Sequence, residues 1–299
     1  MSGYEKLTVV TSAAWLARDL DAAGVVPVTR DIGLDAPVLD GATALWCPGV
    51  YATRMVATGL EHPFASFGPD WPFFFPHRFL RRTVIADRLS DVRWLAAASL
   101  PGPVFGKLAE HKAPSAPARV YPSIDAFASR LREVFGDAAE DLQVLVSAPI
   151  VFRAEYRCFI AHGQVTAASF YLLRTRTGGE ITWDAFETAE QAPPVESAVR
   201  FAQQVVDALE DGHRATGAPE CGQPDGWVLD VGLDENGAWS VVEPNASWSS
   251  NPYHADPAGV VRSILASQDP AGRPDWRWRP DPVLAARVRP FPTSTRSTS

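Results

Sequence analysis

Cysteine and long apolar runs are scarce in this chain, and each scarcity excludes a class of protein. The three cysteines, Cys47, Cys158 and Cys221, lie far apart in the sequence, which predicts neither a disulfide framework nor a cysteine-based zinc site. No run of about 18 apolar residues occurs, so we expect no membrane span. The first residues lack the basic and apolar segments of a signal peptide. These features together predict a cytoplasmic protein.

The chain also lacks a surplus of positive charge. Its 27 Lys and Arg residues are outnumbered by 35 Asp and Glu residues, which gives a formal net charge of -8. A surface that binds nucleic acid needs clustered basic residues, so we expect no nucleic-acid partner. The first predicted strand is not followed by a G-x-G-x-x-G motif, and a dinucleotide-binding fold is therefore not indicated.

The length and the apolar content allow a sizeable core. The chain has 299 residues, of which 46% are hydrophobic, and this size predicts two domains or one domain with lobes. Short apolar runs at 7–11, 25–28 and 42–47 flank helical segments, a pattern typical of a parallel α/β lobe. We assign this lobe to residues 1–100.

A second α/β region follows at residues 101–268, and the end of the chain differs from it in composition. Residues 269–299 are dominated by proline, arginine, serine and threonine, which predicts a loosely held tail. Prolines and aromatic residues crowd residues 62–82, where a single regular helix cannot form. Two interpretations of that segment stay open: a connecting loop whose rings pack on the core, or a lid or substrate wall.

The segment 228–246 reads as a β-hairpin with acidic residues inside its strands. The Asn-Gly pair at 236–237 predicts a tight turn. A two-residue loop places Asp230 directly opposite Glu243, and a four-residue loop moves them one diagonal step apart. Strand side chains alternate between faces, so both registers put Asp230, Glu243 and Asn245 on one face. The opposite, apolar face is expected to carry Leu229, Val231, Leu233 and Val242.

Two carboxylates that face each other across a strand pair repel and destabilise the sheet. The repulsion is relieved if a cation lies between Asp230 and Glu243. Two carboxylates and the Asn245 amide oxygen form a set of oxygen ligands suited to Mg²⁺ or Mn²⁺, and Mg²⁺ commonly adds substrate phosphates to such a set. The alternative is a solvent-exposed face on which these acids are ordinary surface residues.

A metal that bridges phosphates also needs basic side chains nearby. Lys107 ends an apolar run and Lys112 follows it, so either can reach phosphate oxygens or lie on the surface. Glu155 and Arg157 share a face of a second predicted hairpin at 155–170. Arg157 can pair with Glu155 or meet a transferring phosphoryl group.

The order of these motifs resembles the ATP-grasp superfamily. A lysine on a strand, a V-L-V-S strand, the run E-Y-R-C-F-I-A-H-G, then V-L-D-V-G and V-V-E-P-N-A follow one another between about residues 103 and 253. The run is most similar to a divergent clade of small bacterial and phage ATP-grasp proteins with an E-Y-R strand motif. The resemblance implies an α/β (α+β) ATP-grasp fold. A pre-grasp lobe, residues 1–100, would precede a small lobe (101–149) and a large lobe (150–268) that clasp ATP.

The resemblance implies roles for residues of the small lobe. Lys107, helped by Lys112, would bind the α- and β-phosphates of ATP. Two positions depart from the usual pattern: Leu108 stands where many relatives have proline, and Ala148 stands where an acidic residue often binds ribose. The backbone edge of the hinge strand would bind adenine, through residues Val144, Leu145, Val146 and Ser147.

The resemblance also implies roles for residues of the large lobe. Arg157 would contact the γ-phosphate and the transition state, and Glu155 would orient Arg157 or contact the nucleotide. Asp230, Glu243 and Asn245 would hold Mg²⁺ or Mn²⁺.

The implied activity is an ATP- and Mg²⁺-dependent ligase that joins a carboxylate to an amine or a thiol through an acyl phosphate. Its substrates would be small molecules or peptides. Two alternatives stay open on the same site: a small-molecule kinase, and a nucleotide-binding protein without activity, which the departures at Leu108 and Ala148 would favour. The sequence specifies neither the acyl donor, the acceptor, the general base nor the oligomeric state.

Overall fold

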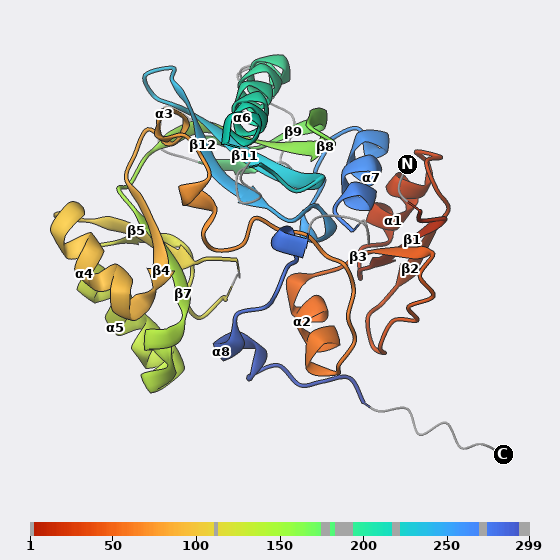
Figure 1. Cartoon of the computed structure of the whole chain (residues 1–299), viewed down its shortest axis with the longest axis horizontal. Coiled ribbons are helices and arrows are strands. Elements are labelled where there is room, and N and C mark those ends of the chain that lie inside the picture. The colour runs from red at the N-terminus through yellow and green to blue at the C-terminus, as the bar shows by residue number, and fades with distance from the viewer. Residues whose placement is uncertain are drawn as a thin grey trace.

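The computed structural model describes residues 3–110, 113–174, 180–182, 194–216, 222–268 and 274–292. Within these ranges, three β-sheets and the helices around them form three groups (Figure 1). No helix in the described part of the chain is long and apolar enough to cross a membrane.

The N-terminal sheet is parallel, with strand order β2-β1-β3, which confirms the predicted parallel α/β pattern. The middle strand of the sequence pattern begins three residues later than expected, at Val28 rather than Val25. The elements are β1 (Lys6–Val10), α1 (Ala14–Asp21), β2 (Val28–Asp31), β3 (Thr43–Trp46) and α2 (Gly49–Ala57).

The second sheet is antiparallel, with order β4-β7-β5-β6. Its edge strand β4 pairs with β7 from Val84↔Ser147 to Arg88↔Gln143. Residues 84–99 therefore belong to this sheet and its helices, although we expected the small lobe to begin at residue 101. The elements are β4 (Val84–Arg88), α4 (Leu89–Ser99), β5 (Val104–Leu108), β6 (Arg119–Tyr121), α5 (Ile124–Phe135), η2 (Gly136–Asp141) and β7 (Gln143–Ser147).

The third sheet is the largest, with order β10-β9-β8-β11-β12. The helix α6 covers one face, and α7 lies between the other face and the N-terminal sheet (Figure 1). The β8–β9 turn at His162 and Gly163 has φ values of 49° and 75°, as a tight hairpin turn requires. The elements are β8 (Phe152–Ala161), β9 (Gln164–Arg174), β10 (Glu180–Thr182), α6 (Val195–Thr216), β11 (Gly226–Asp234), β12 (Trp239–Asn245), η4 (Ser247–Ser249) and α7 (Pro257–Ala266).

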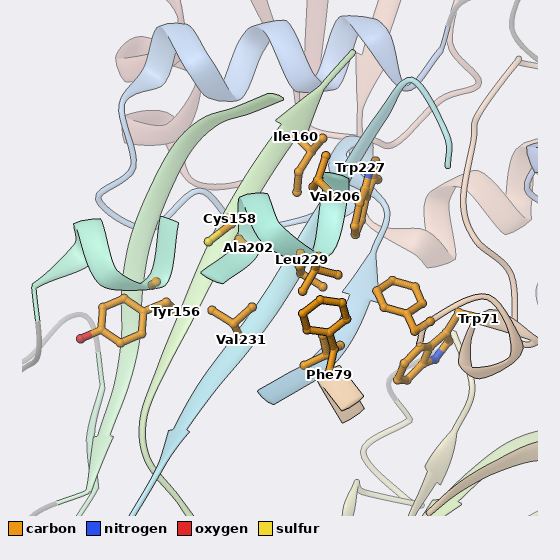
Figure 2. Close-up of a cluster of buried hydrophobic side chains, with 14 of the residues drawn as sticks. Trp71, Phe79, Tyr156, Cys158, Ile160, Ala202, Val206, Trp227, Leu229 and Val231 are labelled. Atoms are coloured by element: carbon orange, nitrogen blue, oxygen red, sulfur yellow. The ribbon is translucent and has the colours of Figure 1, made fainter. Parts of the chain in front are cut away.

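The face of this sheet beneath α6 forms an apolar core. Cys158 of β8 and Leu229 of β11 point toward Ala202 and Val206 of α6 (Figure 2). Because strand side chains alternate between faces, the residues between these core positions project toward the other side of the sheet. The core packing of β8 and β11 thus sets the direction of their polar side chains.

The segment 62–82 packs on the same core. Phe67, Trp71, Phe75 and Phe79 are buried in it, as the loop interpretation predicts. The segment includes η1 (Trp71–Phe73) and α3 (His77–Leu80).

The prediction of a loose C-terminal tail is wrong for residues 274–292. Trp276, Trp278 and Phe291 are buried, and the Arg54 guanidinium lies 3.9 Å from the centre of the Phe291 ring. Burial of large aromatic side chains outweighs the polar composition of this segment. It contains η5 (Pro274–Trp276) and α8 (Pro282–Ala285).

Two helical glycines allow a test of the packing between α7 and the third sheet. A Cβ added at Gly259 of α7 would lie 2.1 Å from the Thr166 carbonyl oxygen of β9. We expect Gly259→Ala to lower the free energy of unfolding by about 1–3 kcal/mol, because the helix must move away. A Cβ at Gly212 of α6 meets nothing within 4 Å, so Gly212→Ala should raise it by roughly 0.5–1 kcal/mol. Urea unfolding measures both, and equal effects would contradict the close contact.

Candidate active site

The hairpin of β11 and β12 places Asp230 directly opposite Glu243. Neither expected register runs through the whole hairpin, because the pairing shifts by one residue beyond Asp230 and leaves Val242 in a β-bulge. Arg82 donates hydrogen bonds to the carbonyl oxygens of Val241 and Val242, at 2.7 and 2.9 Å. A guanidinium from outside the hairpin therefore satisfies the backbone of the bulge.

The bulge changes which residue of β12 faces the core. Val241 is buried with Leu229 and Val231, whereas Val242 is only half-buried. The expectation that Val242 faces the core is therefore wrong, since a bulge inserts one residue and reverses the alternation beyond it.

Arg157 of β8 binds Asp230 of β11 across the sheet. Its Nε and Nη2 donate to the two carboxylate oxygens at 2.9 and 2.7 Å, and the residues are 5% and 1% exposed. Burial lowers the pKa of the guanidinium, but the attraction of Asp230 prevails and holds that pKa above its usual range. The two groups form a buried, bidentate ion pair.

Glu243 has its own protein cation. Lys107 of β5 donates to its carboxylate, and this contact joins the second sheet to the third. Asn245 lies between the two acids: its Nδ2 donates to Asp230 at 3.0 Å and to Glu243 at 3.3 Å. The repulsion between the facing carboxylates is thus relieved by Arg157 and Lys107, without requiring a metal ion.

Two tyrosines border the guanidinium of Arg157. It lies 5.6 Å from the ring centre of Tyr171 and 5.1 Å from that of Tyr253, and the two rings are stacked. Tyr171 donates to the Glu155 carboxylate. Glu155 therefore contacts Tyr171, while Arg157 pairs with Asp230 instead of Glu155.

These groups meet at a cleft of about 780 Å³. Lys107, Arg157, Glu243 and Asn245 line it, and Asp230 is buried behind them. The cleft wall also includes parts of α2, of the 62–82 segment and of the C-terminal segment. All three groups of elements therefore contribute to one cavity, and its volume suits a small molecule.

The sequence matches the model of one protein family over residues 79–263, and the model describes an ATP-grasp domain, the second family of its clade. The match covers more than half of the chain. The chain belongs to this ATP-grasp family. The match begins just before β4, which agrees with the position of β4 in the second sheet. An ATP-grasp fold implies ATP binding, and it places the two clasping lobes at the second and third sheets.

Solved structures of ATP-grasp proteins are similar to this chain at low identity. The ATP-grasp ligase PsnB, complexed with minimal precursor, is 14% identical with a TM-score of 0.46, covering 89% of this chain and 100% of its own. For D-cycloserine synthetase DcsG the values are 13%, 0.48, 95% and 100%. For D-alanyl-alanine synthetase A from Vibrio cholerae they are 12%, 0.43, 82% and 89%. No curated protein matches the sequence.

The strand expected to bind adenine is differently placed in this ATP-grasp fold. β7 pairs with β4 on one side and with β5 on the other, so the backbone of Val144–Ser147 has no free edge. The next amide, that of Ala148, donates to the Thr83 carbonyl oxygen at 3.3 Å. An adenine contact through the backbone of Val144–Ser147 is therefore excluded by the strand pairing. Lys112 lies outside the described residues.

Two cleft residues were not found from the sequence. Glu110 lies three residues after Lys107, and Ser66 belongs to the aromatic segment; both line the cleft and are hydrogen-bonded to each other. Glu110 could have been noticed through its closeness to Lys107 in sequence. The sequence held no signal for Ser66, because its contact spans 44 positions.

The residues of the cleft fit Mg²⁺ and ATP phosphates. Glu243 and Asn245 supply carboxylate and amide oxygens, and Lys107 and Arg157 supply positive charge. Within the described ranges, no cluster of three or more His, Cys, Asp or Glu side chains could hold a metal. Mg²⁺ commonly takes one or two carboxylates and completes its shell with phosphates and water. Asp230 can join this set only by sharing its carboxylate with Arg157.

The buried Glu155 makes stability depend on pH. Burial raises the pKa of its carboxyl from 4.5 to about 7, opposed by the Tyr171 hydrogen bond. The folded state then holds the proton more tightly than the unfolded state. The stabilisation is therefore present in full at low pH and is lost as the pH rises from 4.5 to about 7.

We expect Glu155→Gln to reduce the loss of stability between about pH 5 and about pH 8, because glutamine does not ionise. Urea unfolding at several pH values measures this change. Glu235→Gln, at an exposed position of the hairpin turn, is the control and should leave the pH dependence as it is. An unchanged pH dependence in Glu155→Gln would contradict the raised pKa.

Proposed function

We propose that this protein is an ATP- and Mg²⁺-dependent ligase that joins a carboxylate to an amine, or to a thiol, through an acyl phosphate. One observation carries the proposal: Lys107, Arg157, Glu243 and Asn245, from the two lobes of an ATP-grasp fold, line one cleft. Positive groups and oxygen ligands in one cavity suit a triphosphate with its metal ion.

In this proposal Lys107 binds phosphate oxygens of ATP and leaves Glu243 when nucleotide enters. Glu243 and Asn245, with Asp230, hold Mg²⁺, which neutralises phosphate charge when it is bound. Asp230 fixes the guanidinium plane of Arg157 through two hydrogen bonds. Arg157 then faces the cleft in a fixed orientation, where it stabilises the negative charge of the transferring phosphoryl group.

The other wall of the cleft supports a substrate pocket. It is mainly apolar, and it adjoins the Ser249–Tyr253 segment that follows the hairpin. We propose that the carboxylate and the amine bind there, as parts of a small molecule or of a peptide end. The apolar wall is formed by Trp46, Val50, Trp278, Leu284 and Val288.

Binding of Mg-ATP is the first test. At 100 times its Kd, a ligand adds about 2.7 kcal/mol to the stability of the folded state. For a chain of this size, roughly 2–4 °C per kcal/mol translates this into a rise of several degrees in Tm. No shift with millimolar Mg-ATP would overturn the proposal.

Turnover is the second test, measured as ADP release over pooled amino acids and small carboxylates. A ligase forms an acyl phosphate, which hydroxylamine traps as a hydroxamate. A kinase releases ADP and leaves a stable phosphorylated product without hydroxamate. A nucleotide-binding protein without activity shifts its Tm with Mg-ATP but releases no ADP.

A further inference from the structure

Glu110 occupies a separate position in the cleft, away from the Asp230–Glu243 pair. It lies two residues beyond the end of β5, and its carboxylate accepts a hydrogen bond from the Ser66 hydroxyl. The Gly68 amide donates to the same hydroxyl at 3.0 Å. Glu110, Ser66 and Gly68 all line the cleft. A carboxylate at the cleft wall is thus held in one orientation by the loop opposite β5.

Among the cleft-lining residues in the described part of the chain, the other ionisable groups have tasks that exclude proton acceptance. Lys107 and Arg157 carry positive charge, and Glu243 is placed to hold the metal ion. The Arg287 guanidinium donates to two carbonyl oxygens at the end of α5. Burial raises the pKa of the Tyr253 hydroxyl, which keeps it protonated. Glu110 is the carboxylate that remains.

The surroundings of Glu110 suit proton transfer near neutral pH. Burial raises the pKa of its carboxyl to about 7, whereas the Ser66 hydrogen bond and the charge of Lys107 lower it and Asp70 raises it. A general base works best when its pKa lies near the operating pH.

We propose that Glu110 is the general base that takes a proton from the incoming amine, an inference that rests on the proposed ligase function. The substrate ammonium gives one proton to the Glu110 carboxylate, which becomes a neutral carboxyl group. The freed lone pair attacks the carbonyl carbon of the acyl phosphate. The new C–N bond forms, the C–O bond to the phosphoryl group breaks, and orthophosphate leaves. The tetrahedral adduct loses its second N–H proton to water.

Hydroxylamine separates this role from a structural one, because it is mostly unprotonated at neutral pH and needs no base. The pool of amino acids and small carboxylates supplies the acyl donors and protonated amines. Amide products are measured by mass spectrometry and hydroxamates by their ferric complex. In Glu110→Gln, amide formation should fall by about 100-fold or more, while the rate of hydroxamate formation and the Tm shift with Mg-ATP should stay close to those of the unchanged protein.

The pH profile supplies a second readout. Ser66→Ala removes a hydrogen bond that lowers the pKa of Glu110, so the acidic limb of amide formation should move to higher pH. Glu110→Asp should restore part of the amide rate. Equal losses of amide and hydroxamate in Glu110→Gln, or unchanged amide formation, would overturn the role of Glu110. If the unchanged protein forms neither product although Mg-ATP raises its Tm, the ligase proposal fails and the role of Glu110 fails with it.

Discussion

Asp230→Asn is expected to lower the free energy of unfolding by about 3–5 kcal/mol, because it leaves the buried charge of Arg157 without its counter-ion. The sequence alone suggested the opposite sign, since it showed only two carboxylates that repel. In the structure both oxygens of Asp230 accept hydrogen bonds from Arg157, and neither side chain is more than 6% exposed. Urea unfolding in the absence of metal and nucleotide measures the change.

An exposed pair on α6 is the matched control for this variant. Asp211 and Arg214 are bridged at 3.2 Å, but their side chains are more than 70% exposed. Asp211→Asn should therefore change stability little, as exposed ion pairs contribute little. The double variant Asp230→Asn with Arg157→Gln should regain part of the loss, because the unpaired charge is gone. A stability of Asp230→Asn equal to that of the unchanged protein would refute the buried ion pair.

Glu243→Gln is expected to reduce ATP turnover by at least about 100-fold, because the cleft loses a charged ligand that acts on the reacting phosphates. Its side chain is 19% exposed and its partner Lys107 also reaches the cleft, so the fold should survive. ADP release over the pooled substrates gives the rate. The Tm without ligand should change little, while the rise in Tm with Mg-ATP should shrink.

Glu235→Gln serves as the control for this variant, since Glu235 lies exposed in the turn of the same hairpin. It removes the same charge from the hairpin without touching the cleft, and it should keep full turnover. Full ADP release in Glu243→Gln would show that the hairpin does not hold the metal ion.

The alternation of side chains could be predicted as far as it is local. Asp230, Glu243 and Asn245 do come together on one side of the hairpin, as two-residue periodicity implies. The bulge at Val242 could not be predicted, because the partner of its backbone, Arg82, lies 160 positions away.

Pairing between charges followed the same division. The sequence identified Lys107, Arg157, Asp230 and Glu243 as residues of one site, but it gave no means to match them. The structure pairs Lys107 with Glu243 and Arg157 with Asp230, across 136 and 73 positions. The suggested need for a metal ion between the acids disappeared with these partners, although the cleft still fits Mg²⁺ with phosphates.

The strand Val144–Ser147 shows why a correct motif can still mislead about contacts. Its apolar sequence correctly predicted a strand, yet the residues flanking it in space come from β4 and β5. Strand pairing depends on contacts between distant segments, so a free edge cannot be read from the strand itself.

The sequence by itself determined the class of fold, the order of the motifs and the shared face of the hairpin acids, because periodicity and spacing are properties of neighbouring residues. Only the tertiary structure decided which cation neutralises which acid, which strand edges are free, that residues 274–292 pack on the rest of the chain, and that Glu110 meets Ser66 in the cleft. These outcomes depend on burial and on contacts across many positions, which a single chain of letters does not display.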